Sequence, residues 1–382
     1  MSLQIERRSA KILPGLNGLR FIAAGLVLLQ HCYQQCNKIG LCGAVSRVVI
    51  FDRGLQAVDF FFTLSGFLIT YLLLQELRAA GTVSLKNFYM RRACRIWPLY
   101  YIILGCGIFL LDVVYPRMYH ERYFDFSLGN GLLMYILFLP NWMAAYHKVG
   151  LLLPLWSIGV EEQFYVFWAP LVKRFGRSAF VLVTVFLAVT LVMSILMRSA
   201  VFSNGEGPRA FFLERLRFHY MAVGCFFSCL LFHKGSWLRQ SVFVRKWFCC
   251  FTVSALAYHY IIGFRATGAI LSTALDLGLA VLYGSLIIQV SVAGSGLSFL
   301  EGKAISHLGK ISYGIYMYHM VLAYLARTII VAIHPLGTSV GLTVAFFVAV
   351  FVLTILVAHL SYEFVESYFL SIGHRRYSPK SK

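Results

Sequence analysis

The chain has 382 residues, of which 59% are hydrophobic and only 13% are charged, and its mean hydropathy is +0.75. A soluble domain of this length carries about twice that charged fraction, and here the apolar residues gather in runs of roughly 17–25, the length that crosses a bilayer. This composition excludes a soluble enzyme, a disordered protein and a disulfide-stapled secreted domain. We therefore expect an all-α fold, a polytopic bundle of membrane helices.

The charge is strongly basic, with 34 Lys and Arg against 15 Asp and Glu and a net charge of +19. In a membrane protein, basic residues crowd cytoplasmic loops, where they set the orientation and contact anionic headgroups. The charge thus favours membrane lipids over nucleic acid as partners. The nine cysteines lack metal-ligand spacing, so no metal is expected. Cys32, Cys36 and Cys42 are close enough for one disulfide in an oxidising compartment, although unpaired membrane cysteines are the commoner case.

Eleven apolar runs follow one another along the chain. They lie near 17–35, 55–77, 97–115, 128–145, 151–172, 178–197, 211–232, 247–263, 268–292, 308–333 and 338–361. Both ends are basic, at 7–11 and at 375–382, which predicts that both termini are cytoplasmic and that the number of crossings is even.

A single crossing within 128–172 restores this even number and places the later basic loops in the cytoplasm. We therefore expect about ten transmembrane helices plus a partial, re-entrant or interfacial segment at Pro140-Asn141-Trp142, tolerable where protein or a wet cavity covers it. The expected organisation is one integral-membrane domain over 1–370 and a basic cytoplasmic tail over 371–382. We expect no appended soluble domain.

The first two spans carry polar groups that are costly in lipid and usually face a cavity or a partner. Arg20 and His31 are eleven residues apart, which places them on one helix face about 16 Å apart along the axis. A snorkelling Arg and a hydrogen-bonded core His explain this pair equally well. Asp59 enters the second span at a similar depth to His31, and a carboxylate beside an imidazole prepares a general base.

Small and basic residues mark the next two segments. Ser65-Gly66 at mid-span allows helices to approach closely, and Ser65 lacks the Gly-x-Ser-x-Gly setting of a nucleophile, so packing is the favoured role. In the following loop, Arg92 and Arg95 share a helix face and could clamp phosphate groups bidentately. An interfacial turn that contacts lipid headgroups is an equally good interpretation.

Two later spans are also polar. Adjacent Glu161 and Glu162 point about 100° apart on a helix, so one is expected to pair with an Arg while the other lines a cavity. Ser312, Tyr316 and His319 fall along one helical stripe. Near the inner end of the last span, the carboxylates of Glu363 and Glu366 are expected to pair with nearby Lys or Arg.

Together these segments resemble the acyltransferase 3 family of integral-membrane O-acyltransferases. The matching elements, in the family's order, are Arg20-x10-His31, the block from Ala57 to Ile69, Arg92-Ala93-Cys94-Arg95, the block from Trp156 to Tyr165 and the block from Ser312 to His319. Ala57 stands where the family usually has Gly, and Ile158 where it has Leu. Neither departure affects a chemical group.

The resemblance implies that an acyl group, often acetyl, is transferred from cytoplasmic acyl-CoA to a hydroxyl of a cell-surface glycan or similar acceptor, here without a fused domain. In this interpretation Arg92, Arg95, Arg20 and Ser65 form the acyl-CoA site. His31, oriented by Asp59 or Glu161, takes the proton of the acceptor hydroxyl. An acyl-His or acyl-Ser intermediate remains an alternative.

The expected substrate-binding residues are Glu162, Tyr316, His319 and Trp156. The oxyanion of the tetrahedral intermediate needs a donor, for which His319, Tyr316 and Arg20 are candidates. The implied location is a bacterial inner membrane. The competing hypotheses are a transporter or flippase, which moves a polar substrate along the same residues without chemistry, and a catalytically silent interaction protein.

Overall fold

The computed structural model describes residues 13–42, 49–204, 207, 212, 215–242, 245–263, 268–292, 297–333 and 339–377. All regular secondary structure in these ranges is helical, as the sequence predicts. The long helices are α2 (Leu16–Asn37), α3 (Gly54–Ala80), α4 (Leu85–Ile108), α8 (Leu155–Phe175), α9 (Ala179–Asn204), α11 (Phe218–Gln240), α12 (Lys246–Ile261), α13 (Ala269–Ser291), α15 (Ser312–Ile333) and α16 (Val340–Ser361).

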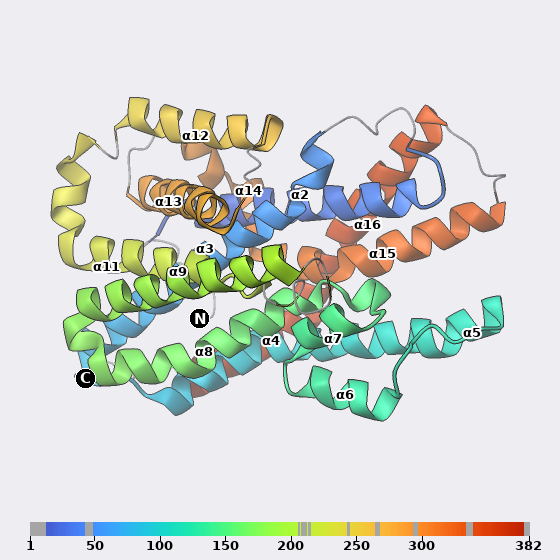
Figure 1. The fold of residues 1–382 in the computed structure, drawn as a ribbon, viewed down its shortest axis with the longest axis horizontal. Helices are drawn as coiled ribbons and strands as arrows, with labels where there is room; N and C mark the ends of the chain where they lie inside the picture. The colour runs from blue at the N-terminus through green and yellow to red at the C-terminus, as the bar shows by residue number, and fades with distance from the viewer. Residues whose placement is uncertain are drawn as a thin grey trace.

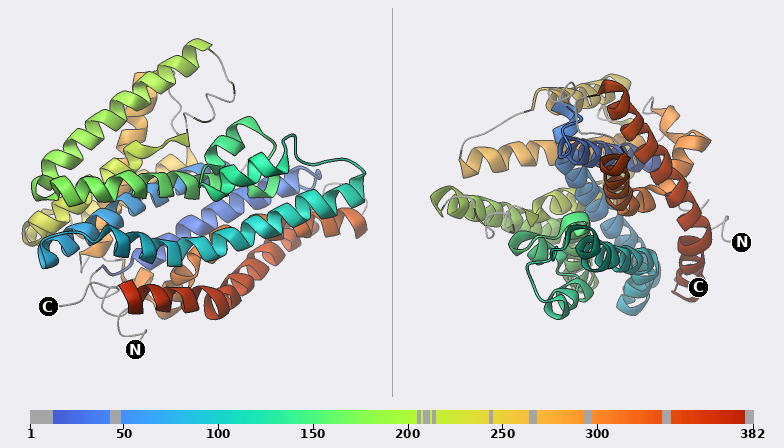
Figure 2. Two further views of the ribbon diagram at one scale, coloured as in Figure 1. Left: turned by 90° about the horizontal axis from the view of Figure 1, so that it is seen from below. Right: turned by 90° about the vertical axis from the view of Figure 1, so that its right-hand side faces the viewer.

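Shorter helical segments connect them. These are η2 (Val49–Asp52), η3 (Phe109–Val114), α5 (Tyr115–Tyr119), α6 (Leu128–Ile136), α7 (Pro140–Tyr146), η4 (Gly150–Leu152), η5 (Gly176–Ser178), η7 (Ser298–Glu301), α14 (Lys303–Lys310), η8 (Tyr362–Glu366) and α17 (Ser367–Tyr377). Figure 1 shows α3 in the middle of the bundle, and α3 packs against α2, α8, α11 and α13. Figure 2 shows α2, α4 and α15 running lengthwise beside one another.

Within the described ranges, seven segments are long and apolar enough to cross a membrane. They are Gly54–Ala80, Leu85–Arg117, Gly150–Ala200, Phe218–Gln240, Ala269–Ser291, Ser312–Ala332 and Val340–Tyr377. One of them, Gly150–Ala200, contains α8 and most of α9. Helix α2, which carries several polar residues, and α12, with 16 residues, are not among the seven. The protein is thus an integral membrane protein, while the count of about ten crossings is not confirmed.

The region 128–172 contains one long helix, α8, preceded by two short ones. Helix α6 has 9 residues and α7 has 7, and at about 1.5 Å per residue neither can span a bilayer. The chain turns between them at Phe138, whose φ is 55°, and Pro140 begins α7, where its fixed φ suits a first helical turn. The predicted partial excursion therefore falls on α6 and α7.

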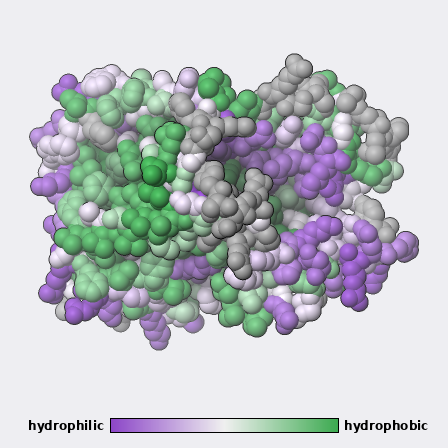
Figure 3. All heavy atoms as spheres, in the orientation of Figure 1, coloured by the Kyte–Doolittle hydropathy of each residue, from purple (hydrophilic) through white to green (hydrophobic). Residues whose placement is uncertain are grey.

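The surface shows the distribution expected of a membrane protein. Figure 3 shows an apolar face over α9 and α13 and hydrophilic residues gathered toward the end of the bundle where α5 lies. Of the terminal basic residues that predict orientation, 7–11 and 378–382 lie outside the described residues. Residues 371–377 form the end of α17, where the carbonyl oxygen of Tyr377 accepts a hydrogen bond of 2.5 Å from Arg91.

Close approach of α3 and α11 depends on two glycines. A Cβ at Gly66 would lie 2.1 Å from the carbonyl oxygen of Met221, and a Cβ at Gly224 would lie 2.0 Å from that of Thr63. Either contact is a severe clash, so only glycine permits this spacing of the two backbones. The predicted packing role of the Ser65-Gly66 pair is confirmed for Gly66. Ser65 instead faces away from α11, toward the site described below.

The start of α4 is fixed to the end of α3. Ser84 caps α4 by accepting a 3.4 Å hydrogen bond from the backbone N–H of Asn87. The carboxylate of Glu76 on α3 accepts from the backbone N–H of Ser84 at 2.8 Å and pairs with Arg91 at 2.9 Å. These contacts set the rotation of α4 and thereby the direction of the face that carries Arg92 and Arg95.

Candidate active site

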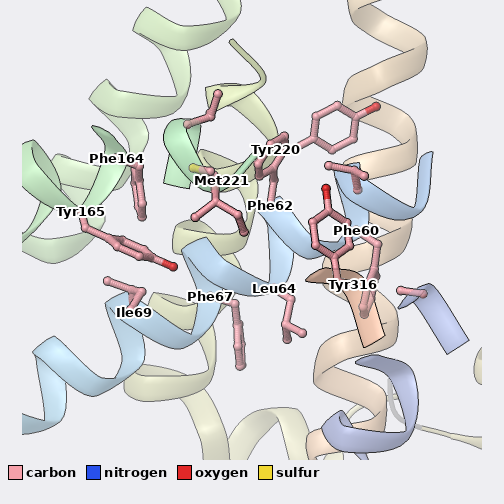
Figure 4. Close-up of a cluster of buried hydrophobic side chains, with 14 of the residues drawn as sticks. Phe60, Phe62, Leu64, Phe67, Ile69, Phe164, Tyr165, Tyr220, Met221 and Tyr316 are labelled. Atoms are coloured by element: carbon pink, nitrogen blue, oxygen red, sulfur yellow. The ribbon is translucent and has the colours of Figure 1, made fainter. Parts of the chain in front are cut away.

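A cavity of about 120 Å³ lies where α2, α3, α4, α8 and α15 meet. Each of the five segments predicted to carry chemistry contributes to its wall. Its polar lining consists of Arg20, Ser65, Arg92, Arg95, Ser157, Glu161, Tyr165, Ser312, Tyr313 and Tyr316, and its apolar lining of Val58, Phe61, Phe62, Leu64, Leu68, Ile69, Ile96 and Ile158. Figure 4 shows side chains of α3 lying between Tyr165 of α8 and Tyr316 of α15.

Three guanidinium groups form a basic wall of this cavity. Arg20 reaches Asn17 at 3.3 Å, and Arg92 lies over the rings of Phe88 and Tyr165 at 5.9 and 6.0 Å. The buried Nε of Arg92 has no hydrogen-bond partner. Among the described residues, none of the three guanidinium groups, that of Arg95 included, forms an ion pair with a carboxylate. The wall is therefore positively charged and retains free donors, the arrangement that binds an anion.

Glu161 lies in the same cavity, at the end of a short hydrogen-bonded chain. The hydroxyl of Tyr165 donates to Glu161 Oε2 at 3.1 Å, and because that donation uses its only proton, Ser65 Oγ, 2.6 Å away, donates to Tyr165. Glu162 points elsewhere, as the predicted angle of about 100° between the two side chains requires, but neither glutamate forms the predicted ion pair with an Arg among the described residues. Its Oε2 accepts a 3.4 Å hydrogen bond from Trp97, and it does not line the cavity.

Another part of the cavity wall combines α8 and α15. Ser157 Oγ and Tyr316 Oη are 2.7 Å apart, and each also reaches the carbonyl oxygen of Pro154, at 3.2 and 3.1 Å. Trp156 does not line the cavity. Its ring packs edge-on against Phe62, with the guanidinium of Arg215 on its face at 5.5 Å.

The two histidines of the predicted site form a direct pair. His31 Nδ1 and His319 Nε2 are 2.8 Å apart, with their rings stacked at a centroid distance of 4.9 Å. His319 is 1% exposed and its Nδ1 lies 2.5 Å from the carbonyl oxygen of Tyr316, whereas His31 is half-buried. Neither imidazole lines the cavity, but Tyr316, which does, lies beside the His319 ring.

These contacts fix the tautomers of both imidazoles. A carbonyl oxygen only accepts, so Nδ1 of His319 carries a proton and its Nε2 is an acceptor. His31 must then donate from Nδ1, which leaves Nε2 of His31 unprotonated in the neutral ring. In the described part of the chain this Nε2 has no hydrogen-bond partner. The pair therefore presents one basic nitrogen, that of His31.

The prediction that a carboxylate orients His31 is wrong. Asp59 is 2% exposed and pairs with Arg217 at 3.3 Å, and Glu161 bonds to Tyr165, so within the described residues neither carboxylate contacts His31. The reason is geometric: Val58 of α3 faces the cavity, and its neighbour Asp59 is turned toward α11. The expected pairing of Glu363 and Glu366 is also wrong for the described basic residues, none of which lies within ion-pair distance.

Asp59 belongs to a charged network that sequence reasoning missed. Asp276 of α13 pairs with Arg217 at 3.2 Å, with His219 at 3.5 Å and with Arg198 of α9. The network joins α3, α9, α11 and α13 and compensates charges that would be costly if buried alone. Arg198 and Asp276 stand at or within apolar runs, so the rule that revealed the other intramembrane charges could have found them.

Comparison with known proteins agrees with these elements. A family model described as an acyltransferase domain matches residues 13–363. Peptidoglycan O-acetyltransferase OatA of Listeria monocytogenes is 26% identical over 378 residues, 94% of this chain and 56% of that protein. The putative peptidoglycan O-acetyltransferase YrhL of Bacillus subtilis is 24% identical over 96% of this chain and 56% of its own, and O-acetyltransferase OatA of Staphylococcus aureus is 26% identical over 98% and 60%.

The chain thus spans less than two thirds of the length of these relatives. No solved structure matches.

Proposed function

Because the chain belongs to the acyltransferase 3 family, we propose that it is a membrane-bound O-acetyltransferase that moves an acetyl group from acyl-CoA to a hydroxyl of a glycan. Three relatives with this activity in their names support the group transferred, and two of those names specify peptidoglycan. A bacterial inner membrane with both termini in the cytoplasm is part of the proposal. The observation that carries it is the meeting of three guanidinium groups, none ion-paired among the described residues, on one cavity, with the histidine pair next to Tyr316 of its wall.

The basic wall fits the donor. Coenzyme A carries several phosphates, and Arg20, Arg92 and Arg95 offer guanidinium forks to which such groups bind bidentately. The unsatisfied Nε of Arg92 is a buried donor that a phosphate oxygen would satisfy. At about 120 Å³ the cavity is smaller than the 300–1,000 Å³ typical of a site for a whole ligand. It accommodates the acyl thioester end, and the nucleotide remains outside on the basic side.

His31 acts as the base in this proposal. Its unprotonated Nε2 takes the proton from the acceptor hydroxyl while the hydroxyl oxygen attacks the thioester carbonyl carbon. The tetrahedral intermediate collapses as the carbon–sulfur bond breaks, and the thiolate of coenzyme A leaves and receives a proton. The ester remains on the acceptor.

His319 takes the orienting role that the sequence assigned to a carboxylate. Its Nε2 accepts from His31 Nδ1 and so keeps the basic lone pair of His31 on Nε2. When His31 takes a proton, the neutral imidazole of His319 stabilises its positive charge less than a carboxylate would. The main effect of His319 is therefore to orient the His31 ring. Tyr316, which lines the cavity and lies beside the His319 ring, is the oxyanion donor in this scheme.

The test uses the purified full chain in lipid nanodiscs with radiolabelled acetyl-CoA and peptidoglycan fragments. We expect label on the glycan and release of free coenzyme A, with both lost in His31→Ala. His233→Ala, a change at an exposed histidine of α11, is the matched control and is expected to keep wild-type rates. Movement of an unmodified glycan without consumption of acetyl-CoA would refute the enzyme and support a transporter or flippase.

A further inference from the structure

Another arginine, Arg327, lies in line with the histidine pair but does not line the cavity. Arg327 is on α15, two turns beyond His319, and its Nη1 donates a 2.8 Å hydrogen bond to Oε1 of Gln35 on α2. Its guanidinium also lies over the ring of Tyr324 at 4.9 Å. Gln35 is only 2% exposed, so Arg327 is directed into the interface of α2 and α15 and not toward lipid.

The two helices place this guanidinium close to the proposed base. Gln35 follows His31 by one turn of α2, about 6 Å along the axis. Arg327 reaches back along α15 to that level. It therefore lies about one helical turn from His31. The direction from His31 to this guanidinium is toward the end of α15 that lies nearest α5, where hydrophilic residues gather (Figures 1 and 3).

The charge of Arg327 is uncompensated within the described residues. No described carboxylate lies within ion-pair distance of it. By contrast, Arg198 and Arg217 both pair with Asp276. A charge within a membrane helix costs a few kcal/mol and marks a functional site by default. The remaining guanidinium donors of Arg327 form a planar fork that matches a carboxylate.

We propose that Arg327, held by Gln35, binds a carboxylate of the acceptor, so that the acceptor is an acidic saccharide whose hydroxyl reaches His31. This inference rests on the proposed function. A single sugar residue with its carboxyl substituent is long enough to span the distance of about one helical turn between His31 and Arg327. The guanidinium then fixes the sugar along the α2–α15 interface and selects anionic over neutral acceptors.

The experiment compares two acceptors that differ only in charge, a trigalacturonate and its fully methyl-esterified form, with acetyl-CoA and the purified full chain. We expect the wild type to have a KM about tenfold to a hundredfold lower for the free acid, the range typical of one charge-assisted contact. Arg327→Gln removes this preference by raising the KM for the acid alone, and Arg327→Lys retains part of it. Arg122→Gln, a change at an exposed arginine, is expected to leave both KM values unchanged.

The ester serves as an internal control for folding, because a misfolded variant loses activity toward both acceptors. A wild type with equal KM values for acid and ester, or an Arg327→Gln variant that keeps the preference, would overturn the carboxylate subsite and leave the proposed function intact. Failure of the wild type to label the trigalacturonate, while peptidoglycan fragments are still labelled, would overturn the carboxylate subsite alone. Failure to label any of these saccharides or to release coenzyme A would refute the proposed function, and the subsite with it.

Discussion

The replacement of His319 by Ala tests the orienting role of this residue most directly. The change removes the acceptor of the 2.8 Å hydrogen bond from His31 Nδ1 and severs the link to the Tyr316 carbonyl oxygen. Without that partner, the proton of neutral His31 can occupy either ring nitrogen, and the ring is free to rotate. The basic lone pair is then no longer held at Nε2.

The size of the effect follows from what the pair supplies. A positioned general base typically contributes 10²–10⁴-fold to the rate, and loss of one hydrogen bond to a ring that is still present removes part of this. We expect kcat to fall by about 10²-fold in His319→Ala. The KM for acetyl-CoA should remain unchanged, because His319 does not line the cavity where the donor binds.

The assay is steady-state transfer of labelled acetyl to the glycan as a function of pH, with His319→Gln beside His319→Ala. Glutamine offers a side-chain carbonyl oxygen as an acceptor for His31 Nδ1 and is expected to restore part of kcat, which a purely packing role would not allow. The orienting role of His319 is refuted if His319→Ala retains kcat within twofold of the wild type, or if it raises the KM for acetyl-CoA while leaving kcat and the pH profile unchanged.

Two further predictions concern the basic wall and the charged network. Arg92→Gln and Arg95→Gln should each raise the KM for acetyl-CoA by about tenfold or more, because each removes charge-assisted contacts to phosphate. Arg78→Gln, a change at an exposed arginine, is the control. An unchanged KM in the Arg92 and Arg95 variants would favour contact of these arginines with lipid headgroups instead. Asp59→Asn should lower the free energy of unfolding by about 1.5–3 kcal/mol, since Asp276 still compensates Arg217. The kcat of the folded variant should stay near the wild-type value. Chemical denaturation measures the change in stability, and transfer rates measure kcat. A loss of kcat without a loss of stability would show that Asp59 takes part in catalysis.

Much of the candidate site could be predicted from the sequence because polar groups are costly in lipid. Arg20 and Glu161 were selected by that cost, Arg92 and Arg95 by their shared helix face, and all four line one cavity. The same rule applied to α9, α13 and α15 would also have indicated Arg198, Asp276 and Arg327. The helical class of the fold follows as directly, since a backbone in lipid must satisfy its own hydrogen bonds.

The contacts among these side chains could not be predicted. The sequence places Asp59 at the depth of His31, but depth does not determine which neighbour a side chain meets. Helix rotation decides that, and the rotation of α3 is set by its close backbone contacts with α11 at Gly66 and Gly224, which turn Asp59 toward Arg217. His319 takes the vacated place because α15 packs on α2.

The sequence by itself thus determined a helical membrane protein, many of the polar residues that line its cavity and the family to which the chain belongs, because hydropathy and charge act locally along each helix. Only the tertiary structure decided that a histidine orients His31, that Glu162 and Trp156 stand outside the cavity, and that Arg327 faces inward without a described carboxylate. These outcomes depend on how helices distant in the chain rotate and pack, and packing is a property of pairs of surfaces that no single segment contains.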